Sequence, residues 1–183
     1  MSNDAGGQGV HPEHALTLLK ERLPKLAAYA VKMGCSTAEA EDVAIDSIIK
    51  LLHRCPDMEP IDNERSWLYK VVGNEAKKIV SKRGRCVSED DLLLGIPQWN
   101  AAEPHVAYEL LETLQALGEL PLEQREAVLL AADGLSYEEI ATISDVSVSA
   151  AKQRVSRGRA TLRALTGRSK PSERDTAGEG RNR

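Results

Sequence analysis

The segment from Leu135 to Arg159 constrains the fold most strongly, because it contains the starts of two helices separated by a tight turn. Ser136 followed by Glu139 is a capping box, a pattern that satisfies free amide groups at a helix start. Ser147 is a second candidate for an N-cap. Ala141 supplies a small side chain where two helices would cross. The segment predicts two crossing helices whose shared core contains Ile140, Ile143, Val146, Val148 and Val155.

The second of these predicted helices has a basic outward face. From position 152 to position 168 the chain has no acid, and its charged residues are Lys152, Arg154, Arg157, Arg159, Arg163 and Arg168. A charge run is usually a solvated helix face. Here it directly follows a tight turn, which is how a helix-turn-helix places its second helix in the DNA major groove. The pattern therefore favours DNA binding.

Composition favours a helical protein outside the membrane. The 183 residues are 42% hydrophobic but only 3% aromatic, and Phe is absent, so the core must consist of Leu, Val, Ile and Ala. Such a composition favours helices. No apolar run approaches the roughly 20 residues that span a bilayer, and the N-terminus lacks the pattern of a signal peptide. We therefore expect a cytoplasmic protein with no membrane insertion.

The chain offers no pattern of catalytic or metal-binding residues. The spacing of Cys35, Cys55 and Cys86 fits no zinc site, and their odd number argues against a disulfide framework. There is no Gly-rich phosphate loop, and the four histidines suggest no catalytic triad. We expect a protein that is not an enzyme and that needs no metal or cofactor.

Charge is strongly segregated along the chain, although its net value is only -4. Residues 64–85 carry seven cations and two acids, whereas residues 88–145 carry thirteen acids and one cation, Arg125. The basic helix beginning near Lys152 follows. Two basic segments separated by an acidic one suggest two DNA contacts joined by a connection that DNA repels.

Helical periodicity and caps predict an all-α fold with two small helical domains. In the first domain we expect a helix over 14–33, kinked at Pro24, a second that starts at the capping box of Ser36 and Glu39, and a third that is capped by Asp62 and runs to about 83. In the second domain we expect helices over 106–117 and between Pro121 and Gly134, and then the helix-turn-helix. The predicted organisation is a disordered 1–12, a first domain over 13–84, a flexible acidic linker over 85–105, a second domain over 106–167 and a disordered tail over 168–183.

Two pairs of segments, in this order, resemble the extracytoplasmic-function (group IV) RNA polymerase sigma factors of the sigma-70 family. Residues 40–52 (AEDVAIDSIIKLL) and 65–74 (RSWLYKVVGN) resemble region 2. Residues 117–130 (LGELPLEQREAVLL), with LSYEEIA at 135–141 and KQR at 152–154, resemble region 4. The resemblance covers most of the chain. It implies an alternative sigma factor that binds core RNA polymerase and directs it to promoters, reading and melting the -10 element with region 2 and reading the -35 element with region 4.

The resemblance also implies three sets of contact residues. Those for core polymerase, at its clamp coiled coil, are Glu41, Asp42, Asp46 and Lys50. Those for -10 DNA are Arg65, Trp67, Tyr69, Lys70, Asn74, Lys77 and Lys78. Those for -35 DNA are Ser147, Lys152, Gln153, Arg154, Ser156, Arg157 and Arg159. Cations can neutralise phosphates, aromatic rings can stack on unpaired bases, and Gln or Lys can read base edges. For Trp67, core packing is an equal alternative.

Other partners and functions stay open at this stage. Members of the family also contact the polymerase flap and are often held by an anti-sigma factor, so both are expected partners. The chain departs from the family pattern at 45–48 (IDSI), at Lys78, and in the turn, where Ser144 and Asp145 replace a Leu-Gly pair. Alternative functions are a helix-turn-helix regulator that does not engage core polymerase, and an adaptor that sequesters a partner.

Overall fold

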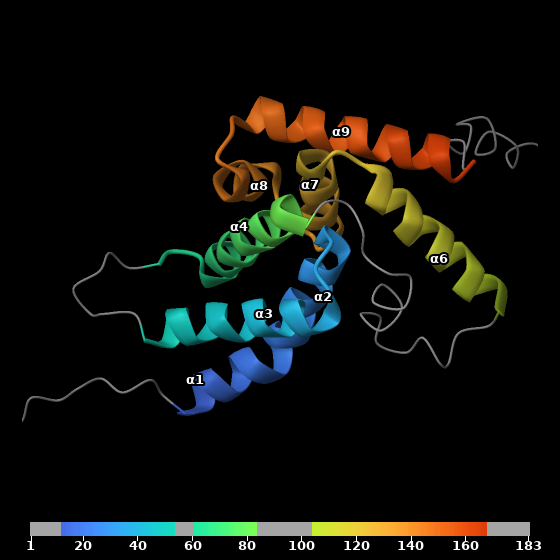
Figure 1. The fold of residues 1–183 in the computed structure, drawn as a ribbon. Coiled ribbons are helices and arrows are strands. Elements are labelled where there is room, and N and C mark those ends of the chain that lie inside the picture. The colour runs from blue at the N-terminus through green and yellow to red at the C-terminus, as the bar shows by residue number, and fades with distance from the viewer. Residues whose placement is uncertain (1–11, 54–60, 84–103, 168–183) are drawn as a thin grey trace, which may run out of the picture.

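The computed structural model describes residues 12–53, 61–83 and 104–167, and these contain helices and turns but no strand (Figure 1). The predicted linker and disordered termini fall almost wholly outside these residues. The elements are α1 (Pro12–Thr17), the π-helical turn η1 (Leu18–Arg22), α2 (Leu23–Met33), α3 (Thr37–Leu52), α4 (Glu64–Arg83), α6 (Pro104–Glu119), α7 (Leu122–Ala132), α8 (Tyr137–Ser144) and α9 (Val148–Leu165).

The N-terminal helix is interrupted where Pro24 was expected to kink it. The π-helical turn η1 separates α1 from α2, and Pro24 occupies the first turn of α2. A proline ring clashes with the carbonyl four residues earlier and has no N–H to donate, so a regular helix cannot continue through this point. The helix ends as expected at Gly34, whose φ of 119° is left-handed.

Four helix starts were predicted from caps, and three of them are confirmed. Ser36 and Ser136 form capping boxes, in which the amide N–H of each serine donates to Glu39 and Glu139 at 2.9 and 2.8 Å. The Ser147 hydroxyl accepts from the Ala150 amide at 3.2 Å.

The predicted cap of the third helix was wrong by one residue. Asn63, not Asp62, accepts from the backbone amide of Ser66 at 3.0 Å. Because α4 begins at Glu64, only the residue at 63 has its side-chain oxygen within reach of the amide three residues on.

Each domain has the core that its helix periodicity predicts. In the first, α2, α3 and α4 pack on one another. Its most buried side chains include Leu26, Ile48, Leu68 and Val72. In the second, α7, α8 and α9 pack together, with Ile140, Ile143 and Val155 buried and Val146 and Val148 partly buried.

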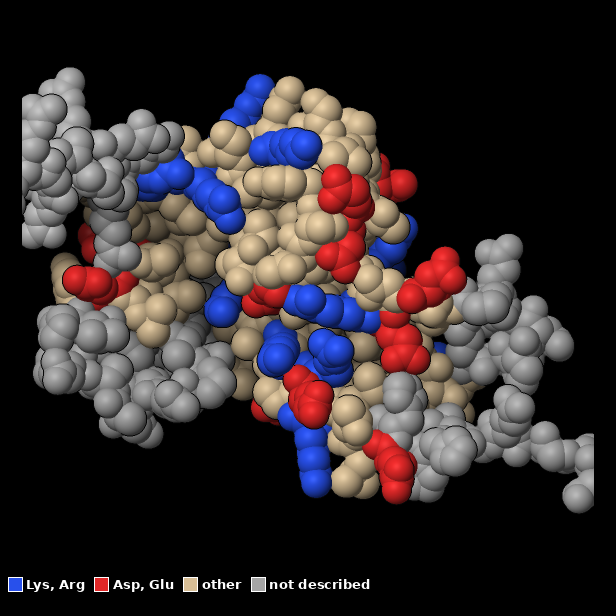
Figure 2. Space-filling model, turned by 180° about the vertical axis from the view of Figure 1, so that it is seen from behind, with Lys and Arg blue, Asp and Glu red and all other residues tan. Residues whose placement is uncertain are grey.

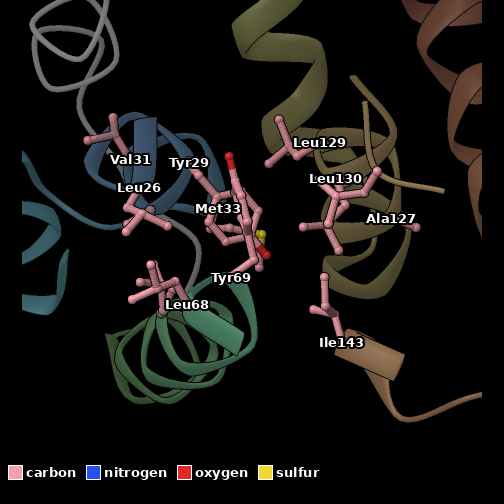
Figure 3. Packing of buried hydrophobic residues seen from close by; sticks show 14 of the residues in the cluster. Leu26, Tyr29, Val31, Met33, Leu68, Tyr69, Ala127, Leu129, Leu130 and Ile143 are labelled. Carbon is pink, nitrogen blue, oxygen red and sulfur yellow. The ribbon is translucent and has the colours of Figure 1, made fainter. Parts of the chain in front are cut away.

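The two domains also pack against each other, which the sequence analysis did not predict. The buried residues of both form one continuous apolar cluster. In Figure 3, Tyr29, Met33 and Tyr69 from α2 and α4 lie toward Leu129 and Leu130 of α7. Two basic helices that were expected to act apart, α4 and α9, are therefore parts of one packed unit.

Candidate nucleic-acid interface

The outward surface of α9 presents the residues predicted for -35 DNA. The packed side of the helix carries Ala151, Val155 and Gly158, all buried. The opposite side exposes Lys152, Gln153, Ser156, Arg157 and Arg159, with Arg154 partly exposed at its edge and Ser147 exposed at the N-cap. Figure 2 shows basic side chains along the top of the molecule, over α9. The helix thus brings all seven predicted residues to one accessible surface.

The turn before α9 holds this surface at a fixed angle to α8. Asp145 ends α8 in the left-handed region with φ 54° and ψ 51°. Asp tolerates this conformation better than most residues, so the turn keeps its geometry without the glycine usual in the family. Gly158 then lets α9 approach α7 closely, because a Cβ at this position would lie 2.5 Å from Val128 Cγ2.

One residue that contacts this surface, Tyr137, was not predicted from the sequence. Lys152 Nζ lies 5.6 Å from the centre of the Tyr137 ring, within the range of a cation–π contact. Tyr137 is the first residue of α8, so the contact ties the two helices of the helix-turn-helix together at their N-terminal ends. The sequence feature that could have indicated this contact is Tyr137 itself, an aromatic residue directly after the cap Ser136 in a chain that has few aromatics.

A recess of about 300 Å³ lies beside the same surface, between α7 and α9. Its lining residues are Pro121, Glu123, Gln124, Ala150, Gln153, Arg154 and Arg157. The last three belong to the predicted -35 set, so the recess extends that surface rather than forming a separate site.

The residues predicted for -10 DNA lie on two different sides of α4. At 100° per residue, Trp67, Asn74 and Lys78 fall within an arc of about 40°. Asn74 and Lys78 are exposed there, and Lys78 pairs with Glu75 at 2.9 Å. That ion pair holds the pKa of Glu75 below its usual value, chiefly through the hydrogen bond from Lys78. Trp67 is partly buried and packs against the core, the alternative role considered for it.

The other predicted -10 residues face the second domain. Lys77 Nζ lies 2.9 Å from Glu126 Oε1 of α7, and Lys70 Nζ donates to the Thr142 carbonyl at 3.2 Å. Arg65 donates to the Asp133 backbone carbonyl, and its guanidinium lies 5.9 Å from the centre of the Tyr69 ring. These cations are held by protein groups in this arrangement.

Tyr69 corrects the expectation of an accessible stacking ring. Its side chain is only 3% exposed, packs edge-on against Tyr29 with ring centres 5.2 Å apart, and donates from its hydroxyl to Asp133 Oδ2 at 2.9 Å. Burial, followed by the nearby Asp133 carboxylate, raises the pKa of Tyr69 well above its ordinary value. The ring is therefore a neutral core group here, because it packs against Tyr29 of α2 and its hydroxyl is held by Asp133, which follows the last residue of α7.

Two residues outside the predicted set, the α4 cap Asn63 and Ser66 in the first turn of α4, also contact the second domain. Asn63 Nδ2 donates to Glu139 Oε1 at 2.8 Å, and the Ser66 hydroxyl donates to the same oxygen at 3.2 Å. No pattern in the sequence pairs positions so far apart, so only the tertiary structure could reveal them.

The polymerase-binding residues predicted on α3 are accessible, and they have apolar neighbours that the sequence analysis did not select. Glu41, Asp42, Asp46 and Lys50 are all exposed. Ile45 and Ile49, which lie between them on the same side of the helix, are 40% and 45% exposed. An acidic rim around exposed apolar side chains is typical of a protein-binding surface.

The fold and these surfaces define a two-domain, all-helical DNA-binding protein with a helix-turn-helix in its second domain. Family models agree: residues 18–86 match "Sigma-70 region 2" and residues 110–162 match "Sigma-70, region 4". The chain belongs to the sigma-70 family, among its extracytoplasmic-function (ECF) sigma factors. It is an alternative sigma factor, a transcription initiation factor that directs RNA polymerase to promoters. This assignment replaces the alternatives of a DNA-binding regulator and an adaptor.

Individual relatives and structures agree. The chain is 32% identical over 149 residues to the ECF RNA polymerase sigma factor EcfG of Rhodopseudomonas palustris, covering 78% of this chain and 80% of that protein. It is 29% identical to the ECF sigma factor SigE of Mycolicibacterium smegmatis, covering 80% of this chain and 59% of the relative. Among solved structures it resembles Bartonella quintana RpoE in complex with the anti-sigma factor NepR, with a TM-score of 0.63, 29% identity, and 85% and 97% coverage of the two chains. It also resembles CnrH in complex with the cytosolic domain of CnrY, with a TM-score of 0.65, 25% identity, and 86% and 90% coverage.

Two kinds of feature are absent from the described residues. None of the helices in that part of the chain is long and apolar enough to cross a membrane. Within the same residues, no group of three or more His, Cys, Asp or Glu side chains is placed to hold a metal ion.

Proposed function

We propose that α9 reads the -35 element. The observation that carries this assignment is the surface of exposed cations and amides on one side of the helix, with no acid among them. Lys152, Gln153, Ser156 and Arg157 face the bases, while Arg154, Arg159 and Ser147 contact phosphates and set the register. Arg and Lys can donate to guanine O6 and N7, and Gln can pair with adenine, so this surface can discriminate sequence.

In region 2, α4 engages the -10 element. Asn74 and Lys78 are accessible for a base edge and a phosphate, and Trp67 lies on the same side of the helix. Arg65, Lys70 and Lys77 add phosphate contacts when region 4 does not occupy them, and Tyr69 can stack on a base only under the same condition. Region 2 corresponds to residues 13–84 and region 4 to residues 106–167.

The exposed side of α3 docks on the clamp of core RNA polymerase. Asp42 and Asp46, with Glu41 and Lys50, steer the encounter and fix its orientation, which is what interfacial charges mainly contribute. Ile45 and Ile49 supply the apolar area that becomes buried. Region 4 contacts the polymerase flap. An anti-sigma factor is also a proposed partner, because the solved structures that this chain resembles are complexes with anti-sigma partners. The proposed place of action is the cytoplasm.

Run-off transcription with purified core polymerase on a library of promoter fragments tests these assignments. Specific start sites should appear only when the protein is added. Arg157→Ala should weaken binding to a -35 duplex by about 1–3 kcal/mol and relax its specificity at one position. Lys20→Ala, which removes an exposed cation from η1, is the matched control and should behave as wild type.

The polymerase assignment needs a separate readout. Ile45→Asp should reduce binding to core polymerase in a pull-down while leaving the affinity for the -35 duplex unchanged. Equal polymerase binding by this variant and wild type would remove α3 from the proposed interface. Loss of both activities would indicate misfolding, which circular dichroism would reveal.

A further inference from the structure

Lys152 lies at one edge of the exposed surface of α9. At 100° per residue, its side chain projects about 100° around the helix axis from Gln153 and about 140° from Arg157. The 5.6 Å distance from its Nζ to the centre of the Tyr137 ring identifies this as the edge beside α8. A lysine is a point charge on a flexible stem, without the planar fork of donors that an arginine has. The helix alone therefore does not fix which acceptor on DNA this residue reaches.

The local backbone fixes the position of Tyr137. This residue is the first of α8 and directly follows Ser136, whose capping box with Glu139 sets where the helix begins. The Ser136 amide donates to Glu139 Oε2 at 2.8 Å, and the Glu139 amide donates to Ser136 Oγ at 3.2 Å. A helix start that is held from both directions leaves the ring little freedom beyond its own two side-chain torsions.

The start of α9 is fixed in a similar way. Asp145 makes the left-handed turn after α8, and Ser147 caps α9 by accepting from the Ala150 amide at 3.2 Å. Ala151 is fully buried on the side of α9 that packs against the other helices of the domain. Lys152 comes directly after it, so its stem leaves a packed backbone close to the Tyr137 ring. The two side chains therefore meet in the protein without DNA.

Packing in the core does not explain the place of the Tyr137 ring. The side chain is 37% exposed and does not belong to the apolar cluster that joins the helices. The face of an aromatic ring is negative and attracts a cation that lies over it. The ring is thus an exposed group whose contact is with a cation of the proposed base-reading set.

We propose that Tyr137 is a positioning residue for -35 recognition: its ring holds the Lys152 ammonium group in one orientation, so that Lys152 discriminates at a single base pair. A lysine free of the ring can donate to acceptors of neighbouring base pairs or to phosphates, which lowers discrimination. A held lysine also has less rotamer freedom to lose when DNA binds. The inference rests on the proposed -35 role of α9 and adds a specificity determinant outside that helix. It requires the ring of Tyr137 but not its hydroxyl.

The first test needs no DNA. In protein labelled at the lysine ε-carbons, the ε-methylene protons of Lys152 are identified by their loss in Lys152→Met. They should resonate upfield of those of Lys20, an exposed lysine of η1, because an aromatic ring shields groups that lie over its face. Tyr137→Phe should keep this upfield shift and Tyr137→Leu should abolish it. Equal shifts of the two lysines in the wild-type protein would overturn the proposal.

The second test measures base discrimination. Holoenzyme assembled from core polymerase and the full chain is competed over promoter fragments that carry every single base-pair change in the -35 element. Lys152→Met identifies the base pair that Lys152 reads. Tyr137→Leu should lower discrimination at that base pair by about two- to fivefold, the factor that corresponds to an exposed cation–π contact, and leave the other positions unchanged. Tyr137→Phe should match the wild-type protein.

Two further variants define the route of the effect. Tyr108→Leu is the matched control, because it makes the same substitution at a tyrosine that is 71% exposed on α6. It should leave discrimination unchanged at every position. Adding Tyr137→Leu to Lys152→Met should cause no further loss at the base pair concerned, because the tyrosine acts only through the lysine. A further loss in the double variant would contradict that route.

The outcomes separate this inference from the proposed function. If Lys152→Met lowers affinity equally for all fragments, Lys152 reads no base, and the inference fails together with that part of the -35 assignment. If Lys152→Met acts at one base pair but Tyr137→Leu leaves discrimination there intact, the inference alone fails. A loss in Tyr137→Phe equal to that in Tyr137→Leu would assign the effect to the hydroxyl and overturn the role of the ring.

Discussion

Arg125 Nη1 donates to the Met33 carbonyl oxygen at 2.8 Å, joining helix α7 of region 4 to the last residue of helix α2 in region 2. The same guanidinium donates to the Gly118 and Leu120 carbonyls, and the side chain is only 6% exposed. A cation at a helix C-terminus is favoured by the helix dipole, and the fork of donors lets one residue serve several carbonyls. The only cation of the acidic segment 88–145 is thus a structural bridge.

Replacing Arg125 by Met should destabilise the protein by roughly 3 kcal/mol, because buried carbonyls of Met33 and Leu120 lose their donor while the apolar bulk remains. Denaturant unfolding followed by circular dichroism measures this change. Glu123→Gln changes an exposed residue two positions before Arg125 on α7, and this variant should unfold at the wild-type midpoint. Equal stability of the Met variant and wild type would mean that the bridge adds nothing.

Gly158→Ala should destabilise region 4 by about 1–3 kcal/mol and weaken -35 binding, because the new methyl group would sit 2.5 Å from Val128 Cγ2 and 3.1 Å from the Gln124 carbonyl oxygen. Gly118→Ala is the matched control. It adds the same methyl group to a helix with nothing within 4 Å, and should stabilise slightly through helix propensity. If both variants behave alike, the close approach of α7 and α9 is not tight in solution.

Asp145→Gly should leave stability unchanged or raise it by up to about 1 kcal/mol, because glycine adopts the left-handed conformation of φ 54° without steric cost. Asp145→Val should destabilise by more than this amount, since a β-branched side chain fits the region poorly. Thermal melts of the two variants give the comparison. A valine variant as stable as the glycine variant would argue that the turn is not left-handed.

The ionisation of Glu139 makes the free energy of unfolding depend on pH in the acidic range, below the ordinary pKa of a glutamate. The pKa of Glu139 is lowered, first by the hydrogen bond from the Ser136 amide and further by Asn63 and Ser66. A depressed pKa means that the carboxylate stabilises the fold above the ordinary value of 4.5, and that this contribution is lost as pH falls through the lower folded value. Melts of wild type and Glu139→Gln should therefore differ above pH 4.5 and converge on acidification. A constant difference would contradict the assignment.

Much of the local structure could be predicted because it depends on neighbours in sequence. The capping boxes at Ser36 and Ser136, the N-cap at Ser147 and the left-handed turn at Asp145 all rest on contacts within a few residues. The cap of α4 was misplaced because Asp62 and Asn63 are both good caps, and only the observed helix start distinguishes them. The exposed surface of α9 was predicted from the run of cations after the turn and from the resemblance to region 4.

What the sequence by itself determined was the set of helices, the two domains and the basic surface of α9, because side-chain periodicity and cap chemistry act over one or two turns. The tertiary structure decided which side of α4 is accessible. Lys77 and Glu126 are 49 positions apart, and nothing in either local pattern shows that one will lie 2.9 Å from the other. Contacts of that range form only when apolar residues of both domains are buried together. For this reason the side of α4 that carries Lys70 and Lys77 is held by region 4, whereas the side that carries Asn74 and Lys78 is exposed. The local sequence around these polar residues does not distinguish the two sides.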